Sequence, residues 1–584
     1  MRKSRRPGIV PPIPTVSRCV TIAFVVFLLG ILPWLSSRDP ALAILRARSA
    51  EQEATPEALG AIRQELGLDA GPFAVFVGWF GRVLTGDWGV SWVSGRPVLP
   101  GMVHAMLVSL SLMAAAFGVA LVVAVALNVA TLRRGLNGQA ARTSGAMAAT
   151  LTSLPEFLLS ALLLVVGAVW LRWFPPYGWS GASSAVLPAL ALGVPAGGLL
   201  GRLVSDSLAS ALSEQWVATW IVSGYSRRTI ALNALRRSLP SVLPQLALVL
   251  VGLVGGAIAV ERVFAIPGIG RATLGGVAAQ DVPTIQAGVM LLMVLSTVLG
   301  AAAGVLRHVL LGPAMRAAAV PVAAPTSATT RRAWLVPAAS LLALAGLIVA
   351  GLPRDAYSSA HARLAPPSGA IPFRADASGR DLLARVAHGA LTTIGTATLV
   401  TAVCLAAGLV IGLCGPAARG PIEVAKAVPP VIAGLVVVAL MGASGAGAAI
   451  AVGAVGWAPL AAHTAALISE ARAQAHVEIA PVLGTGRVRT MLKHILPAVV
   501  GPIVRHAALR LPGTALALAA LGFLGMGPQP PHPDWGLVLA EGMAYVERAP
   551  AAVLGPVGAL VLLSVSAVSL SGMSAGLRRR TEAV

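Results

Sequence analysis

Long apolar runs separated by short polar segments dominate the sequence. A helix needs about 20 mostly apolar residues to cross the roughly 30 Å hydrocarbon core of a bilayer. Twelve runs approach that length, and 186–204 and 427–442 are the weakest of them. They lie near 18–36, 105–132, 146–171, 186–204, 241–261 and 285–306, and then near 334–352, 390–414, 427–442, 447–468, 498–524 and 551–576. The pattern predicts an all-α polytopic membrane protein with about twelve transmembrane helices.

Composition supports this interpretation. Of the 584 residues 57% are hydrophobic and 11% are charged, against about 25% charged in a typical soluble domain. The mean hydropathy is +0.82. A chain this apolar could not cover a water-facing surface with polar groups, so we expect it to lie in a lipid bilayer. The three cysteines, Cys19, Cys404 and Cys414, have neither metal-ligand spacing nor an even number for a disulfide framework.

The basic residues lie mainly in the polar segments between the apolar runs. The net charge of +21 would suggest a nucleic-acid partner in a soluble protein. Short basic loops between apolar runs are instead typical of cytoplasmic loops in a membrane protein. We therefore expect no nucleic-acid partner, an even number of spans and both termini in the cytoplasm.

The plan of the chain repeats around a central segment, 313–333, which is rich in Ala, Pro and Thr and has the composition of a linker. On either side there is one span, a long external segment, three spans, a polar cytoplasmic loop and two final spans. We predict a first half over 1–312 and a second half over 334–584. Six spans in each half make the halves parallel repeats, with the substrate pathway at their interface.

The cytoplasmic loops of the two halves, roughly 205–240 and 469–497, are long for helix connections. Between Glu470 and Gly484 the second loop has good helix formers and mixed charge, which predicts a short helix outside the lipid. Gly484 is placed to end that helix, because glycine adopts left-handed backbone angles without a Cβ clash. The spacing alone leaves two interpretations open, a docking element for a partner or a plain surface loop.

A family resemblance favours docking. Glu478-Ile479-Ala480 with Gly484 and Leu496-Pro497 resembles the EAA-x3-G…LP loop of ABC-importer permeases, specifically those of the dipeptide, oligopeptide and nickel group. The first half resembles the B-type subunit of this group and the second half the C-type subunit, as if two subunits were fused. The motifs are Thr55-Pro56-Glu57-Ala58-Leu59, Gly86-Asp87, Ser94-Gly95-Arg96-Pro97-Val98, Glu261-Arg262-Val263-Phe264 and Pro267-Gly268-Ile269-Gly270-Arg271, then Gly379-Arg380-Asp381, Leu521-Gly522-Phe523-Leu524-Gly525 and Asp534-Trp535-Gly536.

The first copy of the loop departs from the family pattern. Gly224 aligns with the loop glycine, but Ala218-Thr219-Trp220 stands where Glu-Ala-Ala is expected. Either the coupling contact of the first half is weaker than that of the second half, or the groove of the partner that receives it has diverged together with the loop.

The resemblance implies a type I importer permease in the inner membrane of a bacterium, not an enzyme. The sequence has no G-x-x-x-x-G-K-[ST] phosphate loop, so ATP and Mg²⁺ would bind to separate ATPase subunits, either two or one fused. We expect Gly224, Glu470, Glu478, Ala480 and Gly484 to couple to them. An extracytoplasmic binding protein would deliver peptides, or nickel and metal chelates. Pro267, Gly268 and Gly270 predict a tight turn near an external gate.

Two rival functions fit the composition less well. An ion-coupled secondary transporter of small polar solutes generally needs buried carboxylates or a broken-helix ion site. Few ionisable residues fall in the spans, and those present, Glu156, His463 and Glu261-Arg262, lie near span ends. An intramembrane enzyme is disfavoured because there is no H-E-x-x-H pair and no paired carboxylate in the spans.

Overall fold

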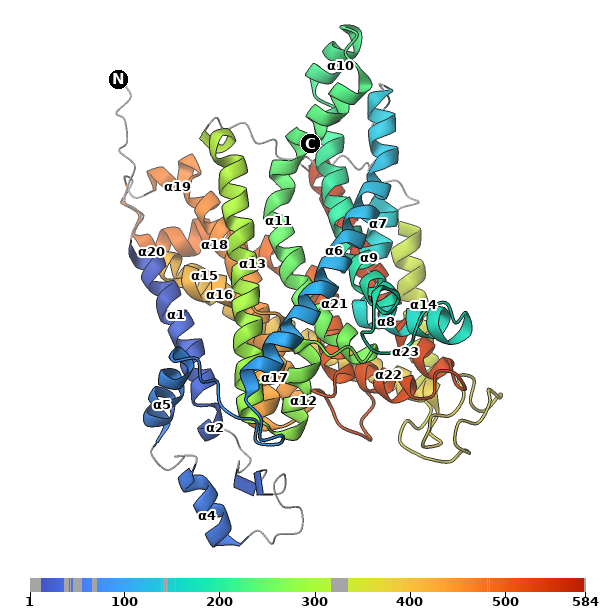
Figure 1. Cartoon of the computed structure of the whole chain (residues 1–584). Coiled ribbons are helices and arrows are strands. Elements are labelled where there is room, and N and C mark those ends of the chain that lie inside the picture. The colour runs from blue at the N-terminus through green and yellow to red at the C-terminus, as the bar shows by residue number, and fades with distance from the viewer. Residues whose placement is uncertain are drawn as a thin grey trace. The chain divides into compact units, whose positions relative to one another are not determined.

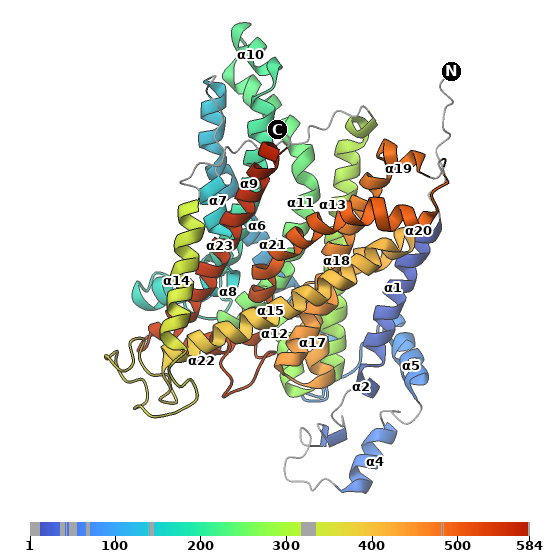
Figure 2. The same cartoon turned by 180° about the vertical axis from the view of Figure 1, so that it is seen from behind.

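The computed structural model of the chain is built from helices (Figures 1 and 2). It describes residues 12–35, 41–42, 44–45, 55–65, 71–137, 139, 145–152, 154–316, 334–480, 482 and 484–581. Most of the predicted linker, 317–333, falls outside them. Within this described part the only extended pairing is two isolated bridges, Val90 with Pro97 and Ala375 with Asp381. The predicted all-α class is confirmed.

In the first half the helices are α1 (Pro12–Gly30), α2 (Leu32–Leu35), α4 (Pro56–Glu65), α5 (Pro72–Leu84), α6 (Val98–Leu136), α7 (Gly145–Thr152), α8 (Glu156–Leu163) with its π-helical continuation Leu164–Trp170, α9 (Ala182–Leu212), α10 (Gln215–Val222), α11 (Arg227–Val263), α12 (Ile269–Ala279) and α13 (Val282–Arg316). In the second half they are α14 (Leu335–Gly351), α15 (Leu382–Leu413), α16 (Arg419–Ala427), α17 (Pro430–Met441), α18 (Gly445–Arg472), α19 (Ala475–Ile479), α20 (Arg487–Thr490) with its π-helical continuation Met491–Ile495, α21 (Leu496–Phe523), α22 (Trp535–Met543) and α23 (Ala551–Thr581).

Each of the twelve predicted spans contains helix. Six helices of the described residues are long and apolar enough to cross a membrane, and the bent pair Gly415–Ala427 with Pro430–Met441 would make a seventh. Shorter apolar helices occupy other predicted spans, including Val16–Gly30 and Leu335–Gly351. The multi-span membrane architecture therefore agrees with the apolar pattern of the sequence.

The third span of each half is broken at proline, which the sequence analysis did not predict. In the first half α7 and α8 flank Pro155, and in the second half α16 and α17 flank Pro429. The second break bends the chain by 89°, so the predicted span 427–442 shortens to α17, which has 12 residues. Proline pushes the residue before it out of the helical region, which separates the two pieces.

The chain folds into two compact units that mix the halves. One unit contains residues 1–99, 276–290 and 394–518, and the other contains 100–275, 291–393 and 519–584. In the first unit α1 of the first half packs against α16 of the second. Ser17 Oγ donates to the Ala417 carbonyl oxygen at 2.6 Å, and Arg18 Nη2 donates to Glu423 Oε1 at 2.8 Å. These polar contacts fix the register of α1 on α16.

In the second unit α9 packs closely on α6 through glycines spaced four residues apart, at Gly193, Gly197 and Gly201. A Cβ at Gly193 would lie 2.5 Å from the Ala116 carbonyl oxygen, so only glycine permits this approach. Small residues at this spacing are typical of membrane helix pairs. In the same unit α14 and α23 lie side by side (Figures 1 and 2), joined by a 2.9 Å hydrogen bond from Ser566 Oγ to Ser340 Oγ.

Candidate functional site

The second loop contains a shorter helix than predicted. α18 continues to Arg472, so Glu470 lies on its last turn rather than on the loop helix. The loop helix α19 has five residues, Ala475–Ile479. Val477 and Ala480 are buried, and Val477 belongs to an apolar cluster with residues of α18 and α21. Glu478 is exposed. The loop therefore holds an apolar face on the helices behind it and leaves the carboxylate of Glu478 in solvent.

Gly484 has the predicted left-handed conformation. Its φ is 78°, and among the described residues, its chain neighbours aside, no atom lies within 4 Å of the position that a Cβ would occupy. The requirement for glycine is therefore the backbone angle and not the space around it. The Thr485 amide donates to the Ala480 carbonyl oxygen at 3.0 Å, which closes the turn in the manner of a Schellman motif.

The first loop has the same construction. α9 ends at Leu212, α10 follows, and α10 caps the end of the α9–α11 pair (Figure 1). Val217 is 3% exposed and packs against Leu208 and Leu212 of α9 and Ile230 of α11. Gly224 has a φ of 79°, and the Tyr225 amide donates to the Trp220 carbonyl oxygen at 3.0 Å.

Corresponding parts of the two loops lie a constant 260 positions apart: 217 and 477 for the buried valine, 220 and 480 for the carbonyl that closes the turn, and 224 and 484 for the glycine. The sequence alignment of Gly224 with Gly484 thus corresponds to matching backbone geometry. This equivalence holds although Ala218-Thr219-Trp220 replaces the expected family residues.

The surfaces of the two loops differ. The first is aromatic: Trp216 contacts Trp220 edge-on with ring centroids 5.1 Å apart, and Trp220 stacks on Tyr225 at 4.8 Å. An ion pair of 2.7 Å from Arg237 Nε to Glu214 Oε2 ties its start to α11. The second loop presents Glu478 instead, with Val482 84% exposed beyond it. The conserved backbone therefore carries two chemically different faces.

The predicted tight turn at Pro267, Gly268 and Gly270 encloses a buried carboxylate. Glu261, at the end of α11, is fully buried. Its Oε1 accepts from Ser109 Oγ at 2.5 Å, and its Oε2 accepts from the Arg271 amide at the start of α12 at 3.0 Å. Helix N-termini stabilise negative charge in this way. A Cβ at Gly268 would lie 2.2 Å from the Glu261 carboxyl carbon, and one at Gly270 2.9 Å from Oε2. Both glycines therefore make room for the carboxylate.

The second half contains a corresponding carboxylate, which the sequence analysis quoted as part of the Asp534-Trp535-Gly536 motif without assigning it a role. Asp534 caps α22: its Oδ1 accepts from the amides of Gly536 at 2.9 Å and Leu537 at 3.2 Å. Its Oδ2 accepts from Thr393 Oγ1 at 2.8 Å. Burial raises the pKa of the Asp534 carboxyl, against the opposing effect of these donors. Ser109 and Thr393 each follow the first residue of their helix by eleven positions. The D-W-G sequence was a signal for a capped helix, but its hydroxyl partner is distant in the chain.

The two carboxylate sites are joined by one contact. Arg262, next to Glu261, donates from Nη1 to the carbonyl oxygen of Leu524. Leu524 lies in the 521–527 segment that packs on Asp534, where a Cβ at Gly522 would lie 2.5 Å from Asp534 Oδ1. Motifs of both halves that the sequence analysis singled out thus meet in one unit.

Comparison with known proteins decides the family. Residues 118–317 and 391–579, more than half of the chain, match the family described as binding-protein-dependent transport system inner membrane component. The chain belongs to this family. Because the family matches twice, the chain holds two permease repeats in one polypeptide, as the B-type and C-type resemblance suggested.

Curated relatives of this permease are about half its length. The glutathione transport system permease GsiC of Salmonella typhimurium is 33% identical over 278 residues, which is 46% of this chain and 87% of GsiC. GsiC of Escherichia coli K12 is 32% identical over 255 residues, 43% of this chain and 81% of GsiC. The metal-staphylopine import permease CntB of Staphylococcus aureus is 27% identical over 298 residues, 51% of this chain and 94% of CntB.

Proposed function

We propose that the chain is the fused transmembrane part of an ATP-driven ABC importer for small peptides or metal chelates. The observation that carries this proposal is the pair of loops with matching backbone and a spacing of 260 positions, in a chain with two repeats of a binding-protein-dependent permease family. One relative is named for glutathione and another for metal-staphylopine. These names support a small peptide or a chelated metal as cargo.

In the proposed mechanism the chain binds no nucleotide itself. ATP and Mg²⁺ bind to two ATPase subunits, or to one fused ATPase, and each loop sits in a groove on one ATPase domain. Val217 and Val477 anchor the loops on the helices behind them, so a push on α10 or α19 is transmitted through packed side chains. Closure of the ATPase domains would then rock the permease between inward-facing and outward-facing states as rigid bodies.

The proposed orientation places both termini and both loops in the cytoplasm of a bacterium, with the chain in the inner membrane. α10 and α12 lie at opposite ends of α11, so the turn at 267–270 then faces outward. An extracytoplasmic binding protein would deliver cargo on that side. The buried Glu261 holds the turn rigid, which suits a gate that moves as a unit with α11 and α12.

The test is reconstituted transport. The chain is placed in proteoliposomes with its ATPase subunits and binding protein, and uptake of radiolabelled glutathione or dialanine is measured. We expect uptake with MgATP and none with a non-hydrolysable ATP analogue. Uptake by the chain alone, driven by a proton or sodium gradient, would contradict the proposal and support an ion-coupled secondary transporter.

A further inference from the structure

Basic residues lie in the middle of α21, inside a predicted membrane span of the second half. The span 498–524 contains Arg505, His506 and Arg510, which the sequence analysis did not count among the ionisable residues of the spans. Arg510 lies next to the midpoint of that span. The helix Val488–Phe523 is long and apolar enough to cross a membrane. A charged side chain at this depth is costly, so it faces water or a polar partner and marks a pathway for substrate or ions.

Two other helices of the same compact unit, α15 and α18, pack against α21 (Figure 2). The ring of His506 contacts that of His463 on α18, with the ring centroids 4.4 Å apart. Arg510 lies within electrostatic range of His506 and of the buried Cys404 on α15. The Arg510 side chain is itself exposed. Arg510, His506 and His463 therefore form one basic patch, contributed by α21 and α18.

No carboxylate of the chain neutralises Arg510. The second half contributes residues 394–518 to this compact unit, and their only carboxylates are Glu423, Glu470 and Glu478. Glu423 is engaged by Arg18, and the other two lie at the end of α18 and on the loop helix α19. Among the described residues the side chain of Arg510 has neither a hydrogen bond nor an ion pair, and only its backbone carbonyl accepts, from Thr514 Oγ1. An acceptor for its guanidinium must come from elsewhere.

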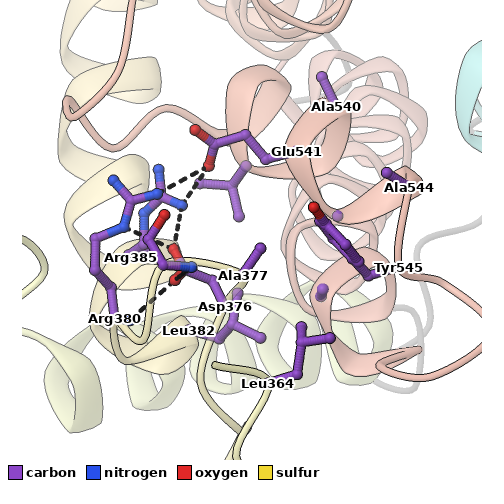
Figure 3. A pocket seen from close by; sticks show the side chains of 14 residues that line it. Leu364, Asp376, Ala377, Arg380, Leu382, Arg385, Ala540, Glu541, Ala544 and Tyr545 are labelled. Carbon is purple, nitrogen blue, oxygen red and sulfur yellow. Dashed lines mark hydrogen bonds and ion pairs between the residues drawn. The ribbon is translucent and has the colours of Figure 1, made fainter. Parts of the chain in front are cut away.

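The buried arginines near the start of α15 show the opposite arrangement. Arg380 Nε and Arg385 Nη1 donate to Asp376 Oδ2 at 2.7 and 2.8 Å, and both side chains also donate to Glu541 (Figure 3). Two guanidinium groups thus meet two carboxylates, so that network is balanced within the chain. The basic patch of α21 lacks such partners and is therefore the better candidate for binding an anion.

The fold does not require basic residues at these positions. α11 covers 227–263, and α20 with α21 covers 487–523, so the spacing of 260 positions found in the loops continues along the whole helix. α9 and α18 likewise end 260 positions apart. At this spacing Arg510, His506 and His463 correspond to Leu250, Leu246 and Leu203. Leu246 packs against an apolar cluster of the first half. Leucine thus serves the packing in one half, whereas the other half has the basic patch.

We propose that this basic patch lines the substrate pathway and binds a carboxylate group of the cargo, with Arg510 as the main contact. The inference rests on the proposed function, which supplies a pathway for α21 to line, and it makes the cargo class anionic. A guanidinium forms strong charge-assisted hydrogen bonds with a carboxylate. The rings of His506 and His463 add N–H donors, and the positive charge attracts anions into the pathway.

Arg505 does not belong to the patch. It lies roughly 140° around α21 from Arg510, because successive residues of an α-helix are about 100° apart. It is also only seven residues into the span, so in the proposed orientation its long side chain can extend to the cytoplasmic headgroups. Arg505 therefore offers a matched control, with the same charge on the same helix but on another face.

The experiment follows the reactivity of a cysteine placed one turn from Arg510. Thr514→Cys is introduced into the full chain, with Cys19, Cys404 and Cys414 replaced by alanine. The chain in lipid nanodiscs, without ATPase or binding protein, is treated with 2-sulfonatoethyl methanethiosulfonate. We expect S-methylglutathione, which has two carboxylates, to slow the modification at least about threefold, and its dimethyl ester to leave the rate unchanged. Equal rates with the acid and the ester, or no modification of the folded chain, would overturn the proposal.

Three variants in this background locate the site. Arg510→Leu introduces the residue type of the first half, so it should fold normally and lose the protection by S-methylglutathione. Arg510→Lys keeps the charge but not the planar group, and should retain part of the protection. Arg505→Leu should be protected as before. Full protection of Arg510→Leu, or equal loss in Arg510→Leu and Arg505→Leu, would overturn the assignment. No ATP is involved, so failure here leaves the test of ATP-driven transport unaffected.

Discussion

The two cytoplasmic loops share their backbone geometry but differ in their outer residues. α10 and α19 share a buried valine, a turn closed by the same hydrogen bond and a glycine with φ near 79°. Their outer residues differ: the first loop carries Trp216, Trp220 and Tyr225, whereas the second carries the exposed Glu478. Backbone geometry has therefore been retained where the loop meets its own helices, whereas the outward face has diverged. This division is expected if each loop docks to a different surface.

The two buried carboxylate sites, at Glu261 and Asp534, also combine a shared contact with a part that differs between the halves. Ser109 and Thr393 supply a hydroxyl from the same position of the second span of each half. The carboxylate itself comes from the end of α11 in one half and from the cap of α22 in the other. The contact has been preserved while the element that provides the acid has changed.

The largest effect on transport is expected for Gly484→Val. A β-branched residue at φ 78° is strained, so the turn after α19 should not form. ATP hydrolysis by the assembled importer should continue, but transport should fall at least about tenfold, an effect of about 1.4 kcal/mol on coupling. Gly486→Val is the control, since Gly486 has no positive φ and the described residues, its chain neighbours aside, leave open space at its Cβ position. Normal transport by the Gly484→Val variant would contradict a coupling role for this loop.

Gly224→Val makes the same change in the first loop, with the same strain at φ 79°. If the first loop docks as the second does, transport should again fall several-fold, measured in the same proteoliposomes. The double variant should then be no worse than the more severe single one, since one broken coupling already stops the cycle. Full activity of Gly224→Val would mean that only the second loop transmits force.

Asp376→Asn tests the buried charge network of the second half, in which Asp376 Oδ2 accepts from Arg380 Nε at 2.7 Å and from Arg385 Nη1 at 2.8 Å. Removing one partner of a buried ion pair costs about 3 kcal/mol, so the unfolding temperature in detergent should drop at pH 7. Because the folded pKa of Asp376 is lowered, its ionised form stabilises the fold above the unfolded pKa of about 3.9. That contribution is lost as the pH falls through the folded pKa, so the difference from wild type should shrink only below about pH 4. The exposed Glu547→Gln is the control.

The smallest effects are expected for Ser109→Ala and Thr393→Val. Each removes the hydroxyl that bridges a carboxylate and a helix N-terminus, which should cost about 1–2 kcal/mol in thermal unfolding. Ser111→Ala on the same helix as Ser109 loses only a bond to its own helix, at Val108, and should be near neutral. Clearly unequal losses for Ser109→Ala and Thr393→Val would break the equivalence of the two sites.

Much of the fold could be predicted because each helix that crosses a bilayer needs an apolar run of a certain length, and such runs can be read directly from the sequence. The glycines at 224, 484, 268 and 270 could also be predicted from the sequence, because a turn that requires glycine is visible there as a glycine next to the end of a helix. The breaks at Pro155 and Pro429 could not, since proline is tolerated inside membrane helices. Nor could the partners of Glu261 and Asp534, which lie 152 and 141 residues away. The contacts of Arg385 with Asp376 and Glu541 likewise join residues that only folding brings together.

The most direct test of the account is the composition of the assembled importer. Native mass spectrometry of the chain, purified with its ATPase subunits and a non-hydrolysable ATP analogue, counts the ATPase domains bound per chain. Two matched loop backbones predict two ATPase domains on one chain, as two subunits or one fused pair. A stable, transport-competent complex with a single ATPase domain per chain would contradict it.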